Sequence, residues 1–89
     1  MDDYTKVEDF MVVGEEGVAT LVYGTVFNNK NRPVSCSVHV EFKDSNGVVK
    51  DVGDDWIDVG GKARAPFRVE STVPGITSAS CGIRNCREK

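Results

Sequence analysis

The stretch from Ser35 to Asp44 constrains the fold more than any other part of this chain. Every second residue there is apolar, namely Cys36, Val38, Val40 and Phe42, and the residues between them are polar. In an extended chain, a period of two places all of these apolar side chains on one face. The stretch therefore predicts a half-buried β-strand with Val38 and Phe42 in the core.

Turn-forming residues bound this strand on both sides. The polar segment Asn28 to Pro33 precedes it, and Asp44-Ser45-Asn46-Gly47 follows it. An Asn-Gly pair tolerates the positive φ that a tight hairpin requires. We therefore expect the chain to reverse direction at both ends of the strand.

Six further segments carry strand signals, with turn residues between them and no helical periodicity. They are Lys6–Val13, Val18–Asn28, Val48–Val52, Trp56–Val59, Arg64–Glu70 and Ser78–Arg84. The Gly53-Asp54-Asp55 segment is expected to carry the chain from one sheet to the other. Short strands at this spacing predict an all-β fold: an immunoglobulin-like β-sandwich of about seven antiparallel strands in two sheets. With 89 residues, we expect one domain, 1–89, with an ordered core over about 6–85.

The charge balance argues against a nucleic-acid partner. The formal net charge is −3, and the basic residues Arg84, Arg87 and Lys89 near the C-terminus are typical of a solvated edge. No apolar run of about 18 residues exists, so we expect no membrane span in this chain. Because the N-terminus does not resemble a signal peptide, we expect either an intracellular protein or an excised fragment.

Three aromatic residues are candidates for an interaction surface: Trp56, Tyr23 and Phe27. On the segment Val18–Asn28 both faces are apolar, so parity alone does not assign its core face. We expect Tyr23 and Phe27 to close the core of a small domain, with an exposed recognition surface as the alternative. Trp56 shares its face with Asp58 and should be partly exposed.

The three cysteines, Cys36, Cys81 and Cys86, leave at least one thiol unpaired within a monomer. Cys36 and Cys81 lie on predicted inward faces, as buried free cysteines do. A disulfide between Cys81 and Cys86 is possible if the strand bends at Gly82 or Asn85, because extended chain would hold the two Cα atoms too far apart.

The sequence gives little support for a metal site or a catalytic site. A zinc site would need His39 beside the cysteines, but His39 alternates against Cys36 and should face solvent. Four acidic residues could bind calcium, or they could form a solvated edge of the sheet. These residues are Asp51, Asp54, Asp55 and Asp58. Ser37 and Ser80 are only generic nucleophiles for the single histidine. We therefore expect no enzyme activity, no cofactor and no metal.

The segments around the central strand resemble the FxLYD domain family in part. The matching segments are Gly24-Thr25-Val26-Phe27-Asn28, Phe42-Lys43-Asp44-Ser45-Asn46-Gly47, and Gly60-Gly61 ahead of Pro66-Phe67-Arg68-Val69. In the segment that names the family, Val40, Phe42 and Lys43 stand where the family has Phe, Leu and Tyr. The resemblance implies an immunoglobulin-like accessory or interaction module, found largely in secreted or surface-attached bacterial and archaeal proteins.

The function expected from these observations is a non-enzymatic binding, spacer or protein-interaction module. The resemblance implies an extracytoplasmic location, and a protein or a neighbouring domain would be the partner. The alternative is a cysteine-dependent metal-binding or redox protein that uses Cys36, Cys81 and Cys86.

Overall fold

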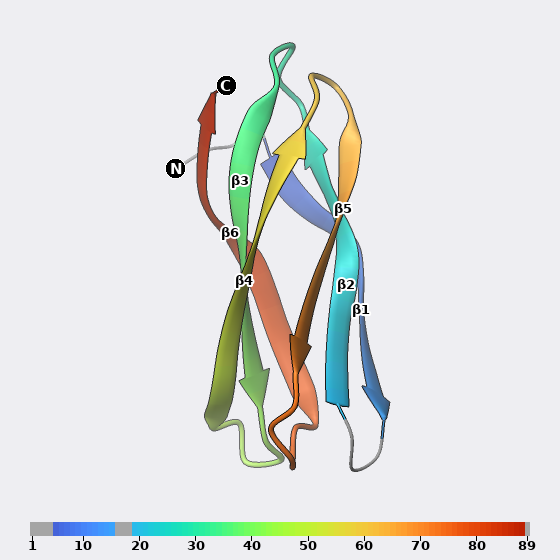
Figure 1. Ribbon diagram of the computed structural model, residues 1–89, viewed down its shortest axis with the longest axis vertical. Coiled ribbons are helices and arrows are strands. Elements are labelled where there is room, and N and C mark those ends of the chain that lie inside the picture. Colours follow the sequence, from blue (N-terminus) through green and yellow to red (C-terminus); the bar gives the residue numbers. More distant parts are fainter. Residues whose placement is uncertain (1–4, 16–18, 89) are drawn as a thin grey trace.

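Six antiparallel strands form two three-stranded sheets in the computed structural model, which describes residues 5–15 and 19–88 (Figure 1). The strands are β1 (Thr5–Glu15), β2 (Ala19–Asn28), β3 (Val34–Lys43), β4 (Val49–Val59), β5 (Arg64–Ser71) and β6 (Ser78–Glu88). One sheet has the order β1-β2-β5 and the other has the order β4-β3-β6. None of the described residues is helical, which confirms the all-β prediction.

The central strand β3 is placed as its alternation predicts. Val38 and Phe42 are fully buried in a core cluster that both sheets supply. The hairpin after β3 also forms, with Gly47 at φ 80°. Asp44 organises this turn, because its carboxylate accepts hydrogen bonds from the backbone N–H groups of Asn46 at 2.9 Å and Val48 at 3.0 Å.

The predicted count of seven strands is not confirmed, because two predicted strands are one. β4 runs without interruption through Gly53-Asp54-Asp55, paired with β3 up to the partners Val59 and Val34. These residues look like a turn in sequence, but β3 supplies their backbone hydrogen bonds. Gly53 also lets β5 approach, since a Cβ atom there would lie 2.5 Å from Cγ1 of Val69. The chain crosses between the sheets after Val59 instead.

β2 presents the opposite face to the core from the one we expected. Val22 and Val26 are fully buried, whereas Tyr23 is 38% exposed and Phe27 is half-buried on the outer face. The prediction that Tyr23 and Phe27 close the core is therefore wrong. The neighbouring strand β5 decides the parity, because its buried Phe67 and Val69 pair with Gly24 and Val22.

The disulfide joins Cys36 to Cys86, and Cys81 is free. The possible Cys81–Cys86 bridge is therefore wrong, and so is the expectation that Cys36 is a free cysteine. The reason is a β-bulge in β6: Ser37 pairs with Asn85 but Val38 pairs with Ile83, which leaves Arg84 as the extra residue. The bulge turns both Cys81 and Cys86 inward. Cys86 then lies directly opposite Cys36, with a Cα–Cα distance of 4.1 Å that suits a cross-strand pair.

Candidate interaction face

The outer face of the β4-β3-β6 sheet is ordered in three columns of side chains. We call the upper part of this face the tryptophan face and define it by Asp54, Trp56 and Asp58 of β4, Ser35, Ser37 and His39 of β3, and Arg84, Asn85 and Arg87 of β6. The β4 column is acidic around an aromatic ring, the β3 column is small and polar, and the β6 column is basic. On β3 and β4 this arrangement follows from the period of two, and on β6 the bulge at Arg84 places Arg87 on the same face.

Trp56 is the centre of the tryptophan face. Its side chain is 50% exposed, which confirms the predicted partial exposure. The guanidinium of Arg87 lies 5.2 Å from the ring centroid, within range of a cation–π contact across the sheet. Ser37, the register partner of Trp56, is buried although it belongs to the outer face. Trp56 therefore leans across β3 towards β6.

Two shallow grooves on this face share Arg84, and one of them borders the ring of Trp56. One has a volume of about 430 Å³ and is lined by Ser37, Asp54, Trp56, Arg84 and Asn85. The other, of about 320 Å³, includes His39, Glu41 and Arg84. Arg84 contributes to both because the bulge projects it from the sheet. The face therefore combines a flat aromatic surface with hydrogen-bonding groups of both charges.

His39 is engaged by carboxylates. Its Nδ1 lies 2.8 Å from Oδ1 of Asp54, and its Nε2 lies 4.0 Å from Oε2 of Glu41. Cys36, on the same strand, points into the core, as the alternation predicted. The part of the chain that the structure describes contains no group of three or more His, Cys, Asp or Glu side chains placed to hold a metal ion.

The four acids proposed for calcium are divided between the two faces of β4. Asp54 and Asp58 point outward, whereas Asp51 and Asp55 turn towards β5. Asp51 accepts a hydrogen bond from Oγ of Ser71 at 2.6 Å, and Asp55 accepts one from the backbone N–H of Arg68 at 3.0 Å. Asp51 and Asp55 thus bind the edge of one sheet to the edge of the other, where β4 and β5 run side by side (Figure 1).

Cys81 lies partly buried on β6, away from the disulfide partners in the register. Burial raises the pKa of its thiol above the usual value, which lowers its reactivity at neutral pH. The other two cysteines are bonded to each other, and Cys36 is fully buried.

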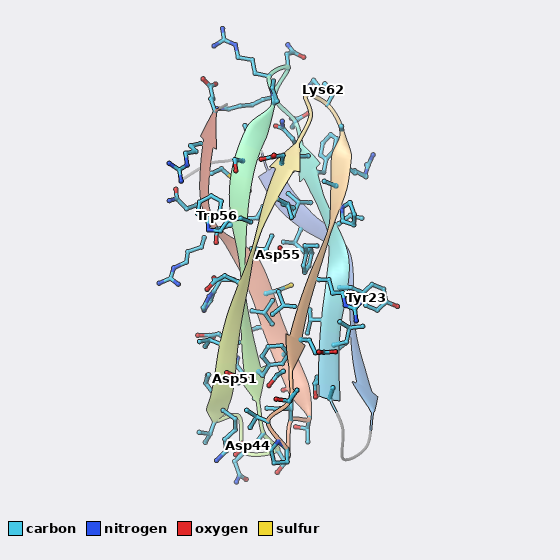
Figure 2. The ribbon with its side chains drawn as sticks, in the orientation of Figure 1. Tyr23, Asp44, Asp51, Asp55, Trp56 and Lys62 are labelled. Atoms are coloured by element: carbon cyan, nitrogen blue, oxygen red, sulfur yellow. A yellow bond between two sulfur atoms is a disulfide. The ribbon has the colours of Figure 1, made fainter. Side chains whose placement is uncertain are left out.

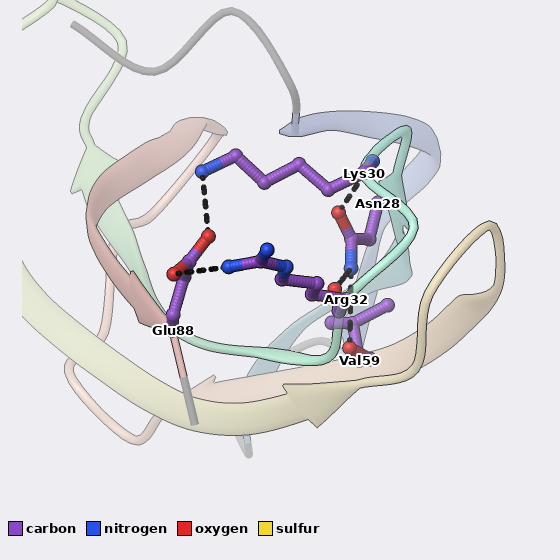
Figure 3. Close-up of polar contacts among 5 residues, drawn as sticks. All are labelled: Asn28, Lys30, Arg32, Val59 and Glu88. Atoms are coloured by element: carbon purple, nitrogen blue, oxygen red, sulfur yellow. Dashed lines mark hydrogen bonds and ion pairs between the residues drawn. The ribbon is translucent and has the colours of Figure 1, made fainter.

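A second polar cluster lies at one end of the molecule, where Asn28 ties two loops together (Figure 3). The side-chain amide nitrogen of Asn28 donates to the carbonyl oxygens of Arg32 at 2.8 Å, Gly60 at 3.1 Å and Val59 at 3.3 Å. Its Oδ1 accepts from the backbone N–H of Lys30 at 2.9 Å. Fully buried Asn28 is therefore a structural residue that fixes this end of the sandwich.

Near this cluster, Lys30 and Arg32 both approach the carboxylate of Glu88, at 3.5 Å and 3.7 Å. Two cations thus share one carboxylate, and these partly exposed pairs contribute little to stability. These pairs do not combine an exposed aromatic ring with separate acidic and basic columns, as the tryptophan face does.

The three aromatic candidates for an interaction surface, Trp56, Tyr23 and Phe27, do not share one surface. Figure 2 shows Tyr23 and Trp56 on opposite sides of the molecule. On the outer face of β1-β2-β5, Phe27 lies 4.6 Å from the guanidinium of Arg64. Trp56 alone is accompanied by acidic, basic and small polar columns, and sequence reasoning missed this arrangement because the Arg84 bulge sets it.

Comparison with known proteins gives a fold relationship only. The sequence matches no family model and no curated protein, so the FxLYD resemblance is not shown. The crystal structure of a DUF1425 family member from Shewanella sp. pv-4 superposes with a TM-score of 0.74, over 91% of this chain and 77% of that chain, at 15% sequence identity. At this identity the likeness establishes a similar β-fold. No helix long and apolar enough to cross a membrane occurs among the described residues.

Proposed function

We propose that this chain is a non-enzymatic, immunoglobulin-like binding module of a secreted or surface-attached microbial protein, and that it binds through the tryptophan face. The observation that carries the proposal is Trp56, half exposed at the centre of a flat face whose rim is charged. Aromatic residues and arginine are the types most often found at the energetic centre of protein interfaces. A protein or a neighbouring domain is therefore the class of partner.

The strand order supports an immunoglobulin-like sandwich. The immunoglobulin fold pairs strands A, B and E in one sheet and strands C and F in the other. In chain order, β1, β2 and β5 correspond to A, B and E, while β3 and β6 correspond to C and F. β4 lies beside β3, as strand C′ does in variable-type domains. The described residues form six strands, so a counterpart of strand G is not among them.

The disulfide supports an extracytoplasmic location. Disulfides form and persist in oxidising compartments and are rare in the cytosol. Cys36 and Cys86 join two neighbouring strands of one sheet, and in a small domain such a bridge compensates for a limited apolar core. The partial FxLYD resemblance implies the same location.

The contacts of the single histidine support a non-enzymatic role. Among the described residues, His39 contacts the carboxylates of Asp54 and Glu41 rather than a serine or a thiol. A nucleophile activated by His39 would have to hydrogen-bond to its ring. The alternative of cysteine-dependent redox chemistry would need access to Cys36, which is fully buried.

Site-specific photocrosslinking tests the binding face. A photoreactive amino acid replaces Trp56 in one variant and Arg68, exposed on the other sheet, in the matched control, and both are expressed in the organism that encodes the chain. We expect a discrete crosslinked product from position 56 and none from position 68. Equal crosslinking from the two positions, or none from position 56, would contradict the proposed face.

Thiol trapping tests the compartment. Cells are acidified, the protein is denatured, and free thiols are alkylated before and after reduction. We expect one alkylated cysteine before reduction and three afterwards, counted by mass. Alkylation of all three cysteines without reduction would show that the bridge does not form where the protein resides.

A further inference from the structure

The columns of the tryptophan face are self-complementary under one particular symmetry. In the register, Asp58, Ser35 and Arg87 form one row across the sheet, and Trp56, Ser37 and Asn85 form the next. The acids of β4 therefore lie on one side of β3 and the bases of β6 lie on the other. A face with this polarity can match a second copy of itself.

A two-fold axis along β3 produces that match. Rotation about this axis keeps each row at its height and exchanges the two outer columns, so that the β4 column of one copy faces the β6 column of the next. Asp58 then meets Arg87 of the second copy. Asp54 faces Gly82 in its own row, and the bulge residue Arg84, two positions along β6, approaches Asp54 through its long side chain. A two-fold axis across the strands would instead place acid against acid and base against base, which costs free energy.

The centre of the same arrangement is apolar. Trp56 leans over β3, so the rings of two copies would meet at the axis with Ser35 and Ser37 beneath them. The small side chains of Ser35 and Ser37 on the axis leave room for the two rings between the sheets. The result is an aromatic centre within a charged rim, which is the usual anatomy of a protein interface.

The lower part of the face does not take part. Glu41 and Lys43 continue the β3 column on the same side of the sheet. In a symmetric contact, each would face the same residue of the second copy and therefore a like charge. Sheets that pack face to face cross at about 30°, so their lower rows separate. The contact is therefore confined to the tryptophan face and is small, which indicates a weak dimer.

We propose that this chain forms a symmetric homodimer through the tryptophan face, with the two-fold axis along β3, paired Trp56 rings at the centre, and Asp58–Arg87 and Asp54–Arg84 pairs between copies. This inference rests on the proposed function, because it names a second copy as the partner of the same face. In this proposal, the separate acidic and basic columns serve the recognition of one copy of the chain by another.

Charge exchange between two variants tests the dimer. Sedimentation velocity is measured over a concentration series for the wild type, for Asp58→Arg, for Arg87→Asp, and for a 1:1 mixture of the two variants. Each variant alone places like charges opposite each other twice, so we expect its dimer dissociation constant to rise by about tenfold or more. In the mixture both pairs are attractive again, and dimerisation should return.

Arg68→Asp, on the other sheet, is the matched control and should leave the dimer unchanged. Thermal melts establish that each variant is folded, and the emission of Trp56, the single tryptophan, supplies a second measure through its blue shift on burial. If Arg87→Asp does not fold, Arg84→Asp mixed with Asp54→Arg makes the same test.

A wild type that stays monomeric up to millimolar concentration would overturn the homodimer, as would single variants that dimerise as well as the wild type. Position 56 could still crosslink to a different protein in cells. In that case the homodimer fails while the proposed binding face stands.

Discussion

Breaking the Cys36–Cys86 bridge gives the largest change in stability that we expect from a single substitution. Cys86→Ala removes the bond and leaves Cys36 as a buried thiol, which proteins tolerate as a small apolar side chain. The bridge links the central strand β3 to the last strand β6, with a sequence separation of 50 residues. It therefore restricts more than half of the unfolded chain.

The expected magnitude follows from loop closure. Closing a loop of this length costs the unfolded state entropy equivalent to about 4 kcal/mol at 25 °C. A domain of this size has a free energy of unfolding of roughly 4 to 13 kcal/mol. At about 4 to 8 °C per kcal/mol, loss of the bridge should lower the Tm by roughly 15 to 30 °C.

The assay is thermal unfolding followed by circular dichroism, for the wild type and for Cys86→Ala, with and without reductant. Cys81→Ala is the matched control, since it removes a thiol from the same strand and leaves the bridge intact. We expect reductant to lower the Tm of the wild type and of Cys81→Ala but not that of Cys86→Ala. An equal Tm for Cys81→Ala and Cys86→Ala in the absence of reductant would refute the reasoning.

Three further predictions concern the contact between β4 and β5, the loops held by Asn28, and the turn after β3. Gly53→Ala should reduce the free energy of unfolding by about 1 to 3 kcal/mol, because its Cβ would overlap Val69, whereas Gly82→Ala, which meets no atom within 4 Å, should change it by less than about 0.5 kcal/mol. Adding Val69→Ala to Gly53→Ala should give a favourable coupling in urea titrations, and strict additivity would contradict the overlap. Asn28→Ala should cost about 2 to 4 kcal/mol, because it removes the hydrogen bonds of a fully buried amide to three loop carbonyls, and a loss below about 1 kcal/mol would show that the loops do not depend on this amide. The hydrogen bond from the backbone of Val48, above all, lowers the pKa of Asp44 below 3.8, so the contribution of this turn should persist above that pH and fade only as the pH falls through the lowered value. An NMR titration midpoint for Asp44 at or above 3.8 would contradict this.

Alternation was sufficient to predict the central strand, because β3 is apolar on one face only. The positions of Val38 and Phe42 followed from the sequence alone. The turn after β3 was equally clear, since Asn-Gly has few other uses. The same logic failed for β2, where both faces are apolar and only its pairing with β5 decides which of them is buried.

Turn signals were misleading where pairing overrides them. Gly53-Asp54-Asp55 has the composition of a turn, yet it continues β4, because β3 supplies its hydrogen bonds and Gly53 admits Val69 from β5. Asp51 and Asp55 contribute to the same edge by binding Ser71 and the backbone of Arg68. These contacts join residues distant in sequence, so no local pattern reveals them.

The cysteine pairing and the candidate site both depend on one bulge. Arg84 shifts the parity of β6, which brings Cys86 opposite Cys36 and places Arg84 and Arg87 on the outer face with Trp56. The exposure of Trp56 could be predicted from its parity with Asp58. The basic column beside it could not, because a one-residue bulge leaves no clear mark in the sequence.

The most direct test of the tryptophan face is NMR mapping of amide signals as the protein concentration is raised from micromolar to millimolar. We expect shifts that grow with concentration at Asp54 to Asp58, Ser35 to His39 and Arg84 to Arg87, while signals around Tyr23 and Arg68 stay constant. Shifts centred on Tyr23, or no change at any concentration, would contradict self-association through this face.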